Sequence, residues 1–291
     1  MNKLKCLITG SEGFIGTSLC KLFNSKGIEF VGYDLVNGDD IRDKLKLDKL
    51  FEAENFDIVI HLAALAGVRR SKEFTVDYET TNIIGTLNVV EMCKKYDCKM
   101  IFFSSSSVLG GNYSEHGLNE NDPYNPQSFY AITKMAGEFI IKQGGIDYII
   151  VRPFTVYGEN GRKDMVIYKW INQIKADKSI TFYGDGKTKR GYTYIEDLVQ
   201  GVYELTKIFT PETKLIIHLG GSEVITLKEL FEIFEAVCAK KKLNCYMTNM
   251  PIPKEDVIMS FADTSYAFML IGFSPEKRFK KMVTKILNKE L

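Results

Sequence analysis

Short apolar runs alternate with helix-length amphipathic segments along the first half of the chain. Runs rich in β-branched and aromatic residues occur at 5–10, 29–34, 57–64, 99–105 and 147–153. The segments between them that have helical periodicity are 14–26, 43–55, 77–96 and 128–143. A strand that is apolar at consecutive positions is buried on both faces, as in a parallel sheet covered by crossover helices. The pattern therefore predicts a doubly wound α/β domain.

After Pro153 this alternation loosens. We expect, in order, a helix over 165–176, a glycine-rich, hairpin-like stretch over 180–194, a helix from Ile195 and a strand over 214–221. A segment of this size suits a smaller α/β domain that closes over the ligand crevice at the carboxyl ends of the strands. The sequence thus predicts a first domain of residues 1–155 and 192–219 and a second of residues 156–191 and 220–291.

The bulk composition excludes several classes of protein. The chain has 291 residues, 45% of them hydrophobic, enough for one large or two modest domains. Lys and Arg number 38 against 37 Asp and Glu, so we expect no nucleic acid or membrane partner. The six cysteines lack the spacing of a zinc site, and no metal is expected. The first apolar run breaks at Thr9 and Gly10, too early for a signal peptide, so a cytoplasmic protein with reduced thiols is expected.

The turn after the first expected strand carries a candidate dinucleotide site. Gly10, Gly13 and Gly16 would let backbone N–H groups approach a pyrophosphate at the positive end of the next helix. Asp34 follows at roughly the 20-residue offset of a carboxylate that binds an adenosine ribose, which favours NAD over NADP. Two alternatives stay open. The glycines could form an ordinary strand-to-helix turn, and Arg42 could accommodate a 2′-phosphate.

Tyr130 and Lys134 are neighbours four residues apart on the helix expected after Pro126. A lysine ammonium beside a phenol favours the phenolate, so we expect Lys134 to lower the pKa of Tyr130. That would make Tyr130 a general base near neutral pH. Such a pair also occurs by chance on solvated helices, so its meaning depends on the motifs around it.

These motifs occur in the order of one known family. The chain resembles the extended short-chain dehydrogenase/reductase family, the NAD-dependent nucleotide-sugar epimerases and dehydratases, over nearly its whole length. The resemblance runs through TGSEGFIG, HLAALAGVRRS, TNIIGTLNVVE, SSSSVLGG, YAITK, VRPFTVYGENGRKDM and RGYTYIEDLVQG. It implies a Rossmann-type domain, bound NAD, a nucleoside-diphosphate sugar as substrate, and a homodimer formed through the helices of 77–96 and 128–143.

The resemblance also implies two sets of contacts. Toward the cofactor they are Gly10, Gly13, Phe14, Ile15, Gly16, Asp34, Asp40, Ile41, Leu62, Ala63, Ala64, Tyr130 and Lys134. Toward the UDP-sugar they are Val68, Arg69, Asn82, Thr155, Arg162, Arg190 and Asp256, with Arg190 near the diphosphate and Asp256 near the ribose. Structural alternatives stay open for some of them. The alanines equally suit close packing, Asn82 a helix interior and Arg162 an exposed turn.

The serines after the fourth strand select among the reactions of this family. Where the chain has Ser106 and Ser107, the dehydratases carry an Asp–Glu pair, and the decarboxylases carry a Glu at the second position. Water elimination needs a proton donor and a base, which neutral serines do not supply. Epimerisation at C4 needs only hydroxyls that hold the reacting oxygen, so the resemblance implies a 4-epimerase.

The implied mechanism is redox-neutral. Tyr130 takes the proton of the sugar 4-hydroxyl, hydride leaves C4 for the nicotinamide, and it returns to the opposite face of a transient 4-keto sugar. The resemblance places Ser105 on the 4-oxygen. Because side chains alternate along a strand, we expect Ser107 beside Ser105, with Ser104 and Ser106 on the other face. The implied catalytic set is Ser105, Tyr130, Lys134 and Ser107.

Residues 151–165 bear on the identity of the sugar. They resemble the UDP-glucuronate 4-epimerases, and Arg162 could bind a carboxylate by a bidentate pair, with Thr155 adding a hydroxyl. Leu109 stands where the family generally has tyrosine, which removes a phenol from the expected wall of the sugar pocket. The leading hypothesis is the conversion of UDP-glucuronate to UDP-galacturonate.

Other activities stay open at this point. One is a 4-epimerase of UDP-glucose or UDP-N-acetylglucosamine, and another is a nucleotide-sugar reductase with net NAD(P) turnover. A non-catalytic, dinucleotide-binding regulator fits poorly, because Ser105, Tyr130 and Lys134 are all present.

Overall fold

The computed structural model describes residues 4–111, 116–254, 256–276 and 278–291. The centre of this described part is a six-stranded parallel sheet in the order β10-β5-β4-β3-β1-β2. Its strands are β1 (Lys5–Thr9), β2 (Glu29–Tyr33), β3 (Ile58–His61), β4 (Lys99–Phe103), β5 (Tyr148–Pro153) and β10 (Lys214–Leu219). The chain proceeds from β1 to β2 on one side and to β3 on the other. Ligands bind at such a switch point, outside the carboxyl ends of the strands.

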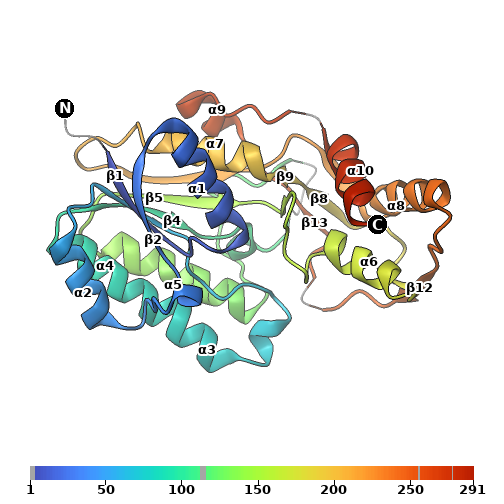
Figure 1. Cartoon of the computed structure of the whole chain (residues 1–291), viewed down its shortest axis with the longest axis horizontal. Coiled ribbons are helices and arrows are strands. Elements are labelled where there is room, and N and C mark those ends of the chain that lie inside the picture. The colour runs from blue at the N-terminus through green and yellow to red at the C-terminus, as the bar shows by residue number, and fades with distance from the viewer. Residues whose placement is uncertain (1–3, 112–115, 255, 277) are drawn as a thin grey trace.

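Alternate residues of the strands pack on opposite faces of the sheet. Cys6 and Ile8 of β1 share a buried cluster with side chains of α1 (Phe14–Lys26) and α7 (Ile195–Leu205). Leu7 belongs to the opposite cluster, with side chains of α2 (Lys44–Ala53), α4 (Thr86–Lys95) and α5 (Phe129–Gln143). Figure 1 shows α1 and α7 on one side of the sheet and α2, α4 and α5 on the other. The predicted doubly wound, Rossmann-type α/β fold is confirmed.

The helix expected over 77–96 is interrupted by a π-helical turn. The structure has α3 (Thr75–Glu79), the π-helical turn Thr80–Gly85, and then α4. Such turns widen a helix by one residue and are frequent at functional sites. Asn82 lies within it.

The later elements form a smaller α/β unit, seen around α6, α8 and α10 in Figure 1. It comprises β6 (Val156–Tyr157), α6 (Val166–Lys175), β7 (Ile180–Tyr183), β8 (Lys189–Gly191), β9 (Thr193–Tyr194), β11 (Val224–Thr226), α8 (Leu227–Lys241), β12 (Met247–Met250), β13 (Met259–Ser260) and α10 (Phe279–Glu290). The expected hairpin over 180–194 is wrong. Strand β7 pairs with β12, whereas β8 lies between β11 and β13. These partners come from distant parts of the chain, which local turn signals do not reveal.

The last part of the chain returns once to the large sheet. Helix α9 (Ser265–Ile271) packs against β10 and α7, and its Ala267 is fully buried in the cluster that includes α1. The domain boundaries given above stay a prediction. Across the residues that the structure covers, no helix combines the length and apolar character of a membrane span.

Candidate active site

The turn between β1 and α1 forms a tight backbone cradle. Gly10 has φ +75°, and a Cβ on it would lie 2.7 Å from the backbone nitrogen of Ala63. A Cβ on Gly16 would lie 2.1 Å from the carbonyl oxygen of Gly10. No side chain caps α1 at Gly13, so the first N–H groups of the helix, including those of Phe14 and Ile15, are left for an anion. The cradle fits the pyrophosphate of a dinucleotide.

Asp34 closes the outer side of this cradle. Its carboxylate accepts the N–H of Glu12 at 2.9 Å and that of Val36 at 3.0 Å, which ties the end of β2 to the glycine turn. A carboxylate has about four lone-pair sites, so acceptor capacity remains for ribose hydroxyls. Ser11 is 2% exposed, and its hydroxyl has no partner among the described residues. An unpartnered buried hydroxyl here fits a polar atom of a bound cofactor.

Arg42, the residue that could accommodate the 2′-phosphate of NADP, is already paired with a carboxylate. Its Nε and Nη2 lie 2.9 and 2.6 Å from Asp40 Oδ2, and this hydrogen bonding holds the pKa of Asp40 below its ordinary value. The pairing favours NAD, because the guanidinium has an anionic partner without a 2′-phosphate. Ile41 is 4% exposed and packs against Gly85, so in this structure it belongs to the hydrophobic core.

The loop after β3 is held beside the glycine turn. Leu62 donates its N–H to the carbonyl of Thr9 at 3.0 Å, and Ala63 donates to Thr9 Oγ1 at 3.3 Å. Ala64 follows and is half-buried. Leu62 and Ala63 thus lie against the glycine turn, and the contact of Leu62, Ala63 and Ala64 with a cofactor stays a prediction.

The serine run is a turn rather than the end of a strand. Strand β4 stops at Phe103, and a 3₁₀ turn spans Ser106–Leu109. The expected alternation along a strand is therefore wrong, yet Ser105 and Ser107 still meet. Ser107 donates to Ser105 Oγ from its N–H at 3.2 Å and from its hydroxyl at 2.8 Å. Leu109 is 1% exposed in a small apolar cluster, so it serves packing.

Ser104 anchors the end of β4 to a buried ion pair. Its hydroxyl donates to Glu138 Oε1 at 2.5 Å, and Arg152 donates to the two oxygens of Glu138 at 2.9 and 2.8 Å. Tyr124 adds a hydrogen bond to the same carboxylate at 2.6 Å. Sequence reasoning missed this pair, although Glu138 lies four residues after Lys134 on the same helix, a spacing that places both on one face.

Tyr130 lies near the start of α5, with its phenol against Ser105. The helix is capped by Ser128, which accepts the N–H of Ala131 at 3.1 Å. Burial raises the pKa of Tyr130, while the positive charge of Arg162 and a hydrogen bond with Ser105 act to lower it. The structure thus corrects the expected cause, because the cation that acts on this phenol is Arg162.

Lys134 is buried one turn further along the helix. Its Nζ lies 4.7 Å from the centre of the Phe102 ring, and burial lowers its pKa to about 7, opposed by the negative charge of Glu138. An ammonium in such a place favours an additional polar partner, as a cofactor ribose would provide. A contact of Lys134 with the cofactor stays a prediction, and in this structure Arg162 rather than Lys134 acts on the pKa of Tyr130.

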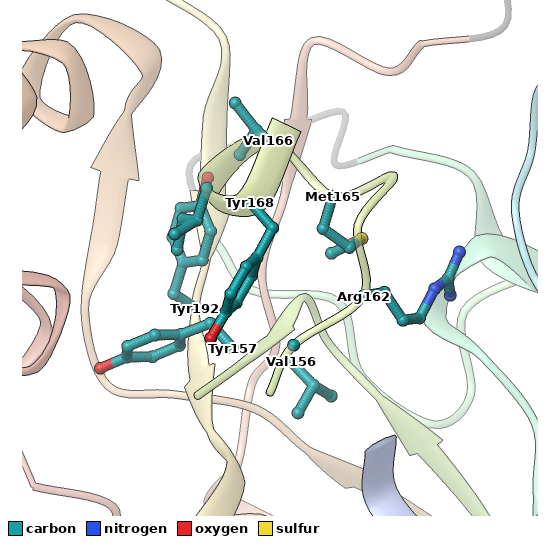
Figure 2. A pocket seen from close by; sticks show the side chains of 9 residues that line it. Val156, Tyr157, Arg162, Met165, Val166, Tyr168 and Tyr192 are labelled. Carbon is teal, nitrogen blue, oxygen red and sulfur yellow. The ribbon is translucent and has the colours of Figure 1, made fainter. Parts of the chain in front are cut away.

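Arg162 and Asp164 form an ion pair on the turn before α6. Arg162 Nε donates to Asp164 Oδ1 at 3.0 Å and Nη2 to Oδ2 at 2.5 Å, which leaves Nη1 without a partner among the described residues. The pair lies over Gly67, whose missing Cβ would be 3.4 Å from Arg162 Nη2. Figure 2 shows Arg162 pointing away from the aromatic side chains that line the pocket under this turn, among them Tyr157. The positive charge of Arg162 acts on Tyr130.

Arg69 and Asp256 bridge the two parts of the molecule. Arg69 donates to Asp256 Oδ2 at 3.0 Å and to the Tyr183 hydroxyl at 2.8 Å, and its guanidinium stacks 4.6 Å from the centre of the Tyr183 ring. Arg190 donates to the carbonyls of Lys189 and Ile258 and has no carboxylate partner in the described part of the chain. The structure brings Arg69 and Asp256 together, while Arg190 forms no ion pair within the described residues, although the charge of Asp256 acts on it through space.

The other residues implied for the substrate have separate positions. Asn82 is 1% exposed and holds both backbone groups of Leu65, accepting its N–H at 2.7 Å and donating to its carbonyl at 2.9 Å. Val68 is half-buried in the loop that carries Arg69. Thr155 is half-buried, and its carbonyl accepts the N–H of Thr193 at 3.0 Å. The side chain of Asn82 thus holds the backbone of the loop after β3 and does not line an open cavity. Thr155 connects the segment after β5 to β9.

Known proteins are similar to this chain in both sequence and structure. The model of the NAD dependent epimerase/dehydratase family matches residues 6–214. The UDP-glucuronate 4-epimerase of Thermodesulfobacterium geofontis is 32% identical, over 97% of this chain and 94% of that protein. A crystal structure of the UDP-glucuronic acid 4-epimerase of Bacillus cereus, in complex with UDP-glucuronic acid and NAD, is similar with a TM-score of 0.88 and 29% identity, over 98% of this chain and 99% of the other.

A more distant structure agrees in fold alone. The UDP-glucose 4-epimerase of Thermus thermophilus, in complex with NAD, has a TM-score of 0.87 at 23% identity, over 98% of both chains. Among the described residues, no group of three or more His, Cys, Asp or Glu side chains could hold a metal ion.

Proposed function

Because the chain belongs to the NAD dependent epimerase/dehydratase family, we propose that it converts UDP-glucuronate to UDP-galacturonate by epimerisation at C4. The observation that carries the proposal is the grouping of Tyr130, Ser105 and Arg162 without a carboxylate at Ser106 or Ser107. A phenol, a hydroxyl and a guanidinium suit the 4-hydroxyl and the carboxylate of a uronate. Two of the relatives named above, those of Thermodesulfobacterium geofontis and Bacillus cereus, are named as 4-epimerases of UDP-glucuronate.

The residues of the chain have the following proposed roles. The glycine cradle and Asp34 bind NAD, which when bound supplies a hydride acceptor and donor at C4. Tyr130 takes the proton of the 4-hydroxyl and returns it, and Ser105 hydrogen-bonds the same oxygen. The hydroxyl of Ser107 donates a hydrogen bond to Ser105 Oγ, which leaves the hydroxyl of Ser105 free to donate to Tyr130 or the substrate.

The substrate carboxylate is proposed to bind Arg162 through Nη1, with Thr155 as a second donor. A guanidinium that is oriented by Asp164 has little rotamer freedom left to lose when the carboxylate binds. Arg190 is proposed to bind the diphosphate, and Arg69 with Asp256 to close the site over the nucleotide. A neutral hexose would leave Nη1 of Arg162 without an anionic partner.

The proposal is tested by incubating the purified protein with three substrates in separate reactions. These are UDP-glucuronate, UDP-glucose and UDP-N-acetylglucosamine, with products resolved by NMR. Inversion at C4 of UDP-glucuronate, with a higher kcat/KM than for the two neutral sugars, is the expected result. Inversion of only a neutral sugar would contradict the proposed substrate. A steady change in the reduced-nicotinamide absorbance would instead identify a reductase, because an epimerase recycles its cofactor.

We also propose that the protein is a homodimer formed through α3, α4 and α5. Large apolar side chains on these helices and on the π-helical turn are 38–67% exposed, namely Val76, Ile84, Leu87, Ile132 and Phe139. Figure 1 shows these helices together on one side of the sheet. Several large apolar side chains exposed on neighbouring helices are more typical of an interface than of a monomer surface.

A further inference from the structure

His61 is a buried titratable side chain with no role in the scheme above. It is the last residue of β3, directly before Leu62, and is 1% exposed. Both ring nitrogens have hydroxyl partners, because Nδ1 lies 2.7 Å from Thr9 Oγ1 and Nε2 lies 3.0 Å from Thr86 Oγ1. The ring therefore joins β1 to α4 across the carboxyl edge of the sheet.

The partners beyond the two threonines fix the direction of this chain of hydrogen bonds. Thr86 Oγ1 lies 2.7 Å from the carbonyl oxygen of Asn82, which can only accept, so Thr86 donates there and accepts from His61 Nε2–H. His61 Nδ1 then carries no proton and accepts from the hydroxyl of Thr9. Thr9 Oγ1 in turn accepts the N–H of Ala63. Because burial lowers the pKa of His61 to about 3, the imidazole is neutral, and its single proton is on Nε2.

This series of hydrogen bonds connects residues Leu62–Ala64, the proposed cofactor floor, to helix α5, which carries Tyr130 and Lys134. At one end lies Ala63, whose backbone nitrogen is 2.7 Å from the position a Cβ of Gly10 would take. At the other end, Asn82 Nδ2 donates to Thr133 Oγ1 at 3.0 Å, and Thr133 donates to the carbonyl of Tyr130 at 2.8 Å. The link therefore runs from the glycine turn to the first turn of α5.

A second link from His61 leads to Lys134. The imidazole stacks on the ring of Phe102, with centroids 5.8 Å apart and an angle of 28°, and Lys134 Nζ lies 4.7 Å from the centre of the same ring. Burial lowers the pKa of His61 to about 3, and the positive charge of Lys134 acts in the same direction. A neutral His61 leaves Lys134 as the one cation on this ring among the described residues.

We propose that His61 is a positioning residue that sets the cofactor floor at Ala63 relative to Tyr130 and Lys134. The inference rests on the proposed epimerase function. Hydride and proton transfer both require reacting atoms in near-attack geometry, and small displacements lower the rate steeply. His61 does not touch the substrate, so its removal affects the chemical step more than substrate binding.

The kinetic test compares His61→Gln with His218→Gln. His218 is equally buried, donates from Nδ1 to the carbonyl of Leu118 at 3.0 Å and lies outside the chain from Ala63 to Tyr130. We expect His61→Gln to lower kcat about ten-fold, with KM for the UDP-sugar changed less than about two-fold, as an interaction that serves only the chemical step predicts. His218→Gln is expected to lower thermal stability similarly and to leave kcat unchanged. Equal kcat values for the two variants would overturn the proposal.

A double-mutant cycle tests the series of hydrogen bonds through His61. Thr9→Val and Thr86→Val each remove one of its hydroxyls while keeping the shape of the side chain. If both act through His61, the double variant should lower kcat no more than the stronger single variant, because residues that act as a unit are not additive. Fully additive effects on kcat would show that the two hydroxyls do not act through one series of hydrogen bonds.

The tautomer gives a readout that is independent of activity. The chain has only three histidines, His61, the exposed His116 and His218, so ¹⁵N spectra of labelled imidazoles resolve them. His61 should be protonated on Nε2, and His218 on Nδ1 because its carbonyl partner only accepts. Protonation of His61 on Nδ1, or its titration between about pH 5 and 8, would contradict the proposed series of hydrogen bonds. If the wild-type protein showed no epimerisation, the proposed function would fail alone, and these spectra would still decide the role of His61 in the fold.

Discussion

At the scale of single residues, the chemistry depends on which groups face the phenol of Tyr130. Ser105 and Arg162 act on it in this structure, whereas Lys134 lies over Phe102. The side chain thus has one hydrogen-bond partner and one nearby cation. Both favour the phenolate against the effect of burial.

Replacing Tyr130 with Phe removes the group that exchanges a proton with the sugar. We expect kcat to fall by about 10³-fold, in the usual range for a general acid–base, with KM for UDP-glucuronate nearly unchanged. NMR of the epimer mixture over time gives both constants. The control is Tyr246→Phe, since Tyr246 is 66% exposed. Retention of most of the activity in Tyr130→Phe would show that another group moves the proton.

Replacing Arg162 with Gln should separate charged from neutral sugars. A hydrogen bond to a charged group contributes about 1.5–3 kcal/mol, so KM for UDP-glucuronate should rise about ten-fold or more. The kcat/KM for UDP-glucose should change much less. The neighbouring exposed Lys163 provides the control variant Lys163→Gln. An equal loss for both sugars would mean that Arg162 does not read the carboxylate.

Lys134 should lower the free energy of unfolding, because its ammonium is buried. Its folded pKa, lowered to about 7 by burial, lies below the ordinary 10.5, so the unfolded chain holds the proton more tightly. Stability therefore rises as pH increases from about 7 to 10.5. We expect Lys134→Met to raise the free energy of unfolding, most below pH 7 and progressively less toward pH 10.5, while activity is lost. Urea denaturation of both proteins across this range is the measurement, and a difference independent of pH would contradict the assignment.

At the scale of elements, the buried pair of Glu138 and Arg152 joins α5 to β5 and, through Ser104, to the end of β4. These are the elements that carry Tyr130 and precede Ser105. Hydrogen bonds from Arg152 help to hold the pKa of Glu138 below its ordinary value. The pair thus fixes two catalytic elements to each other.

Breaking this ion pair should remove the link between α5 and β5 and destabilise the fold. Removing one partner of a buried ion pair costs about 3–5 kcal/mol, so Glu138→Gln should lower the free energy of unfolding by about that amount at pH 7. The double variant Glu138→Gln with Arg152→Met should be less destabilised, since no unpaired charge remains. The contribution of Glu138 is complete above its ordinary pKa of 4.5 and is lost as pH falls through the lower folded pKa. Denaturant titrations at pH 7 and pH 4 measure both effects, and a loss below about 1 kcal/mol at pH 7 would contradict a buried pair.

At the scale of the whole molecule, the apolar side of α4 and α5 should determine the oligomeric state. Phe139 on α5 is 48% exposed beside Ile132 at 43%. Phe139→Lys would place a charge in the proposed interface, so we expect sedimentation to give a dimer for the wild type and a monomer for this variant. Phe268, 62% exposed on α9, supplies the control Phe268→Lys, which should stay dimeric. A wild-type monomer at micromolar concentration would contradict the dimer.

Much of the fold and some of the site could be predicted from the sequence. The parallel sheet followed from continuous apolar runs, because burial on both faces removes the alternation of polar residues. The glycine turn followed from spacing, since Gly10 and Gly16 stand where no Cβ fits. The position of Tyr130 and Lys134 one turn apart on a single helix followed from helical periodicity. All three signals are local in the chain.

The tertiary structure alone decided what depends on distant partners. It paired β7 with β12 rather than β8, and it placed Arg162, not Lys134, as the cation acting on Tyr130. It also joined His61 to two threonines 52 and 25 residues away. Local propensity and periodicity determine which elements form and which face of each is apolar. Contacts between elements arise only when the sheet brings their ends together, so the positions of charges and hydrogen-bond partners in the site are set by packing.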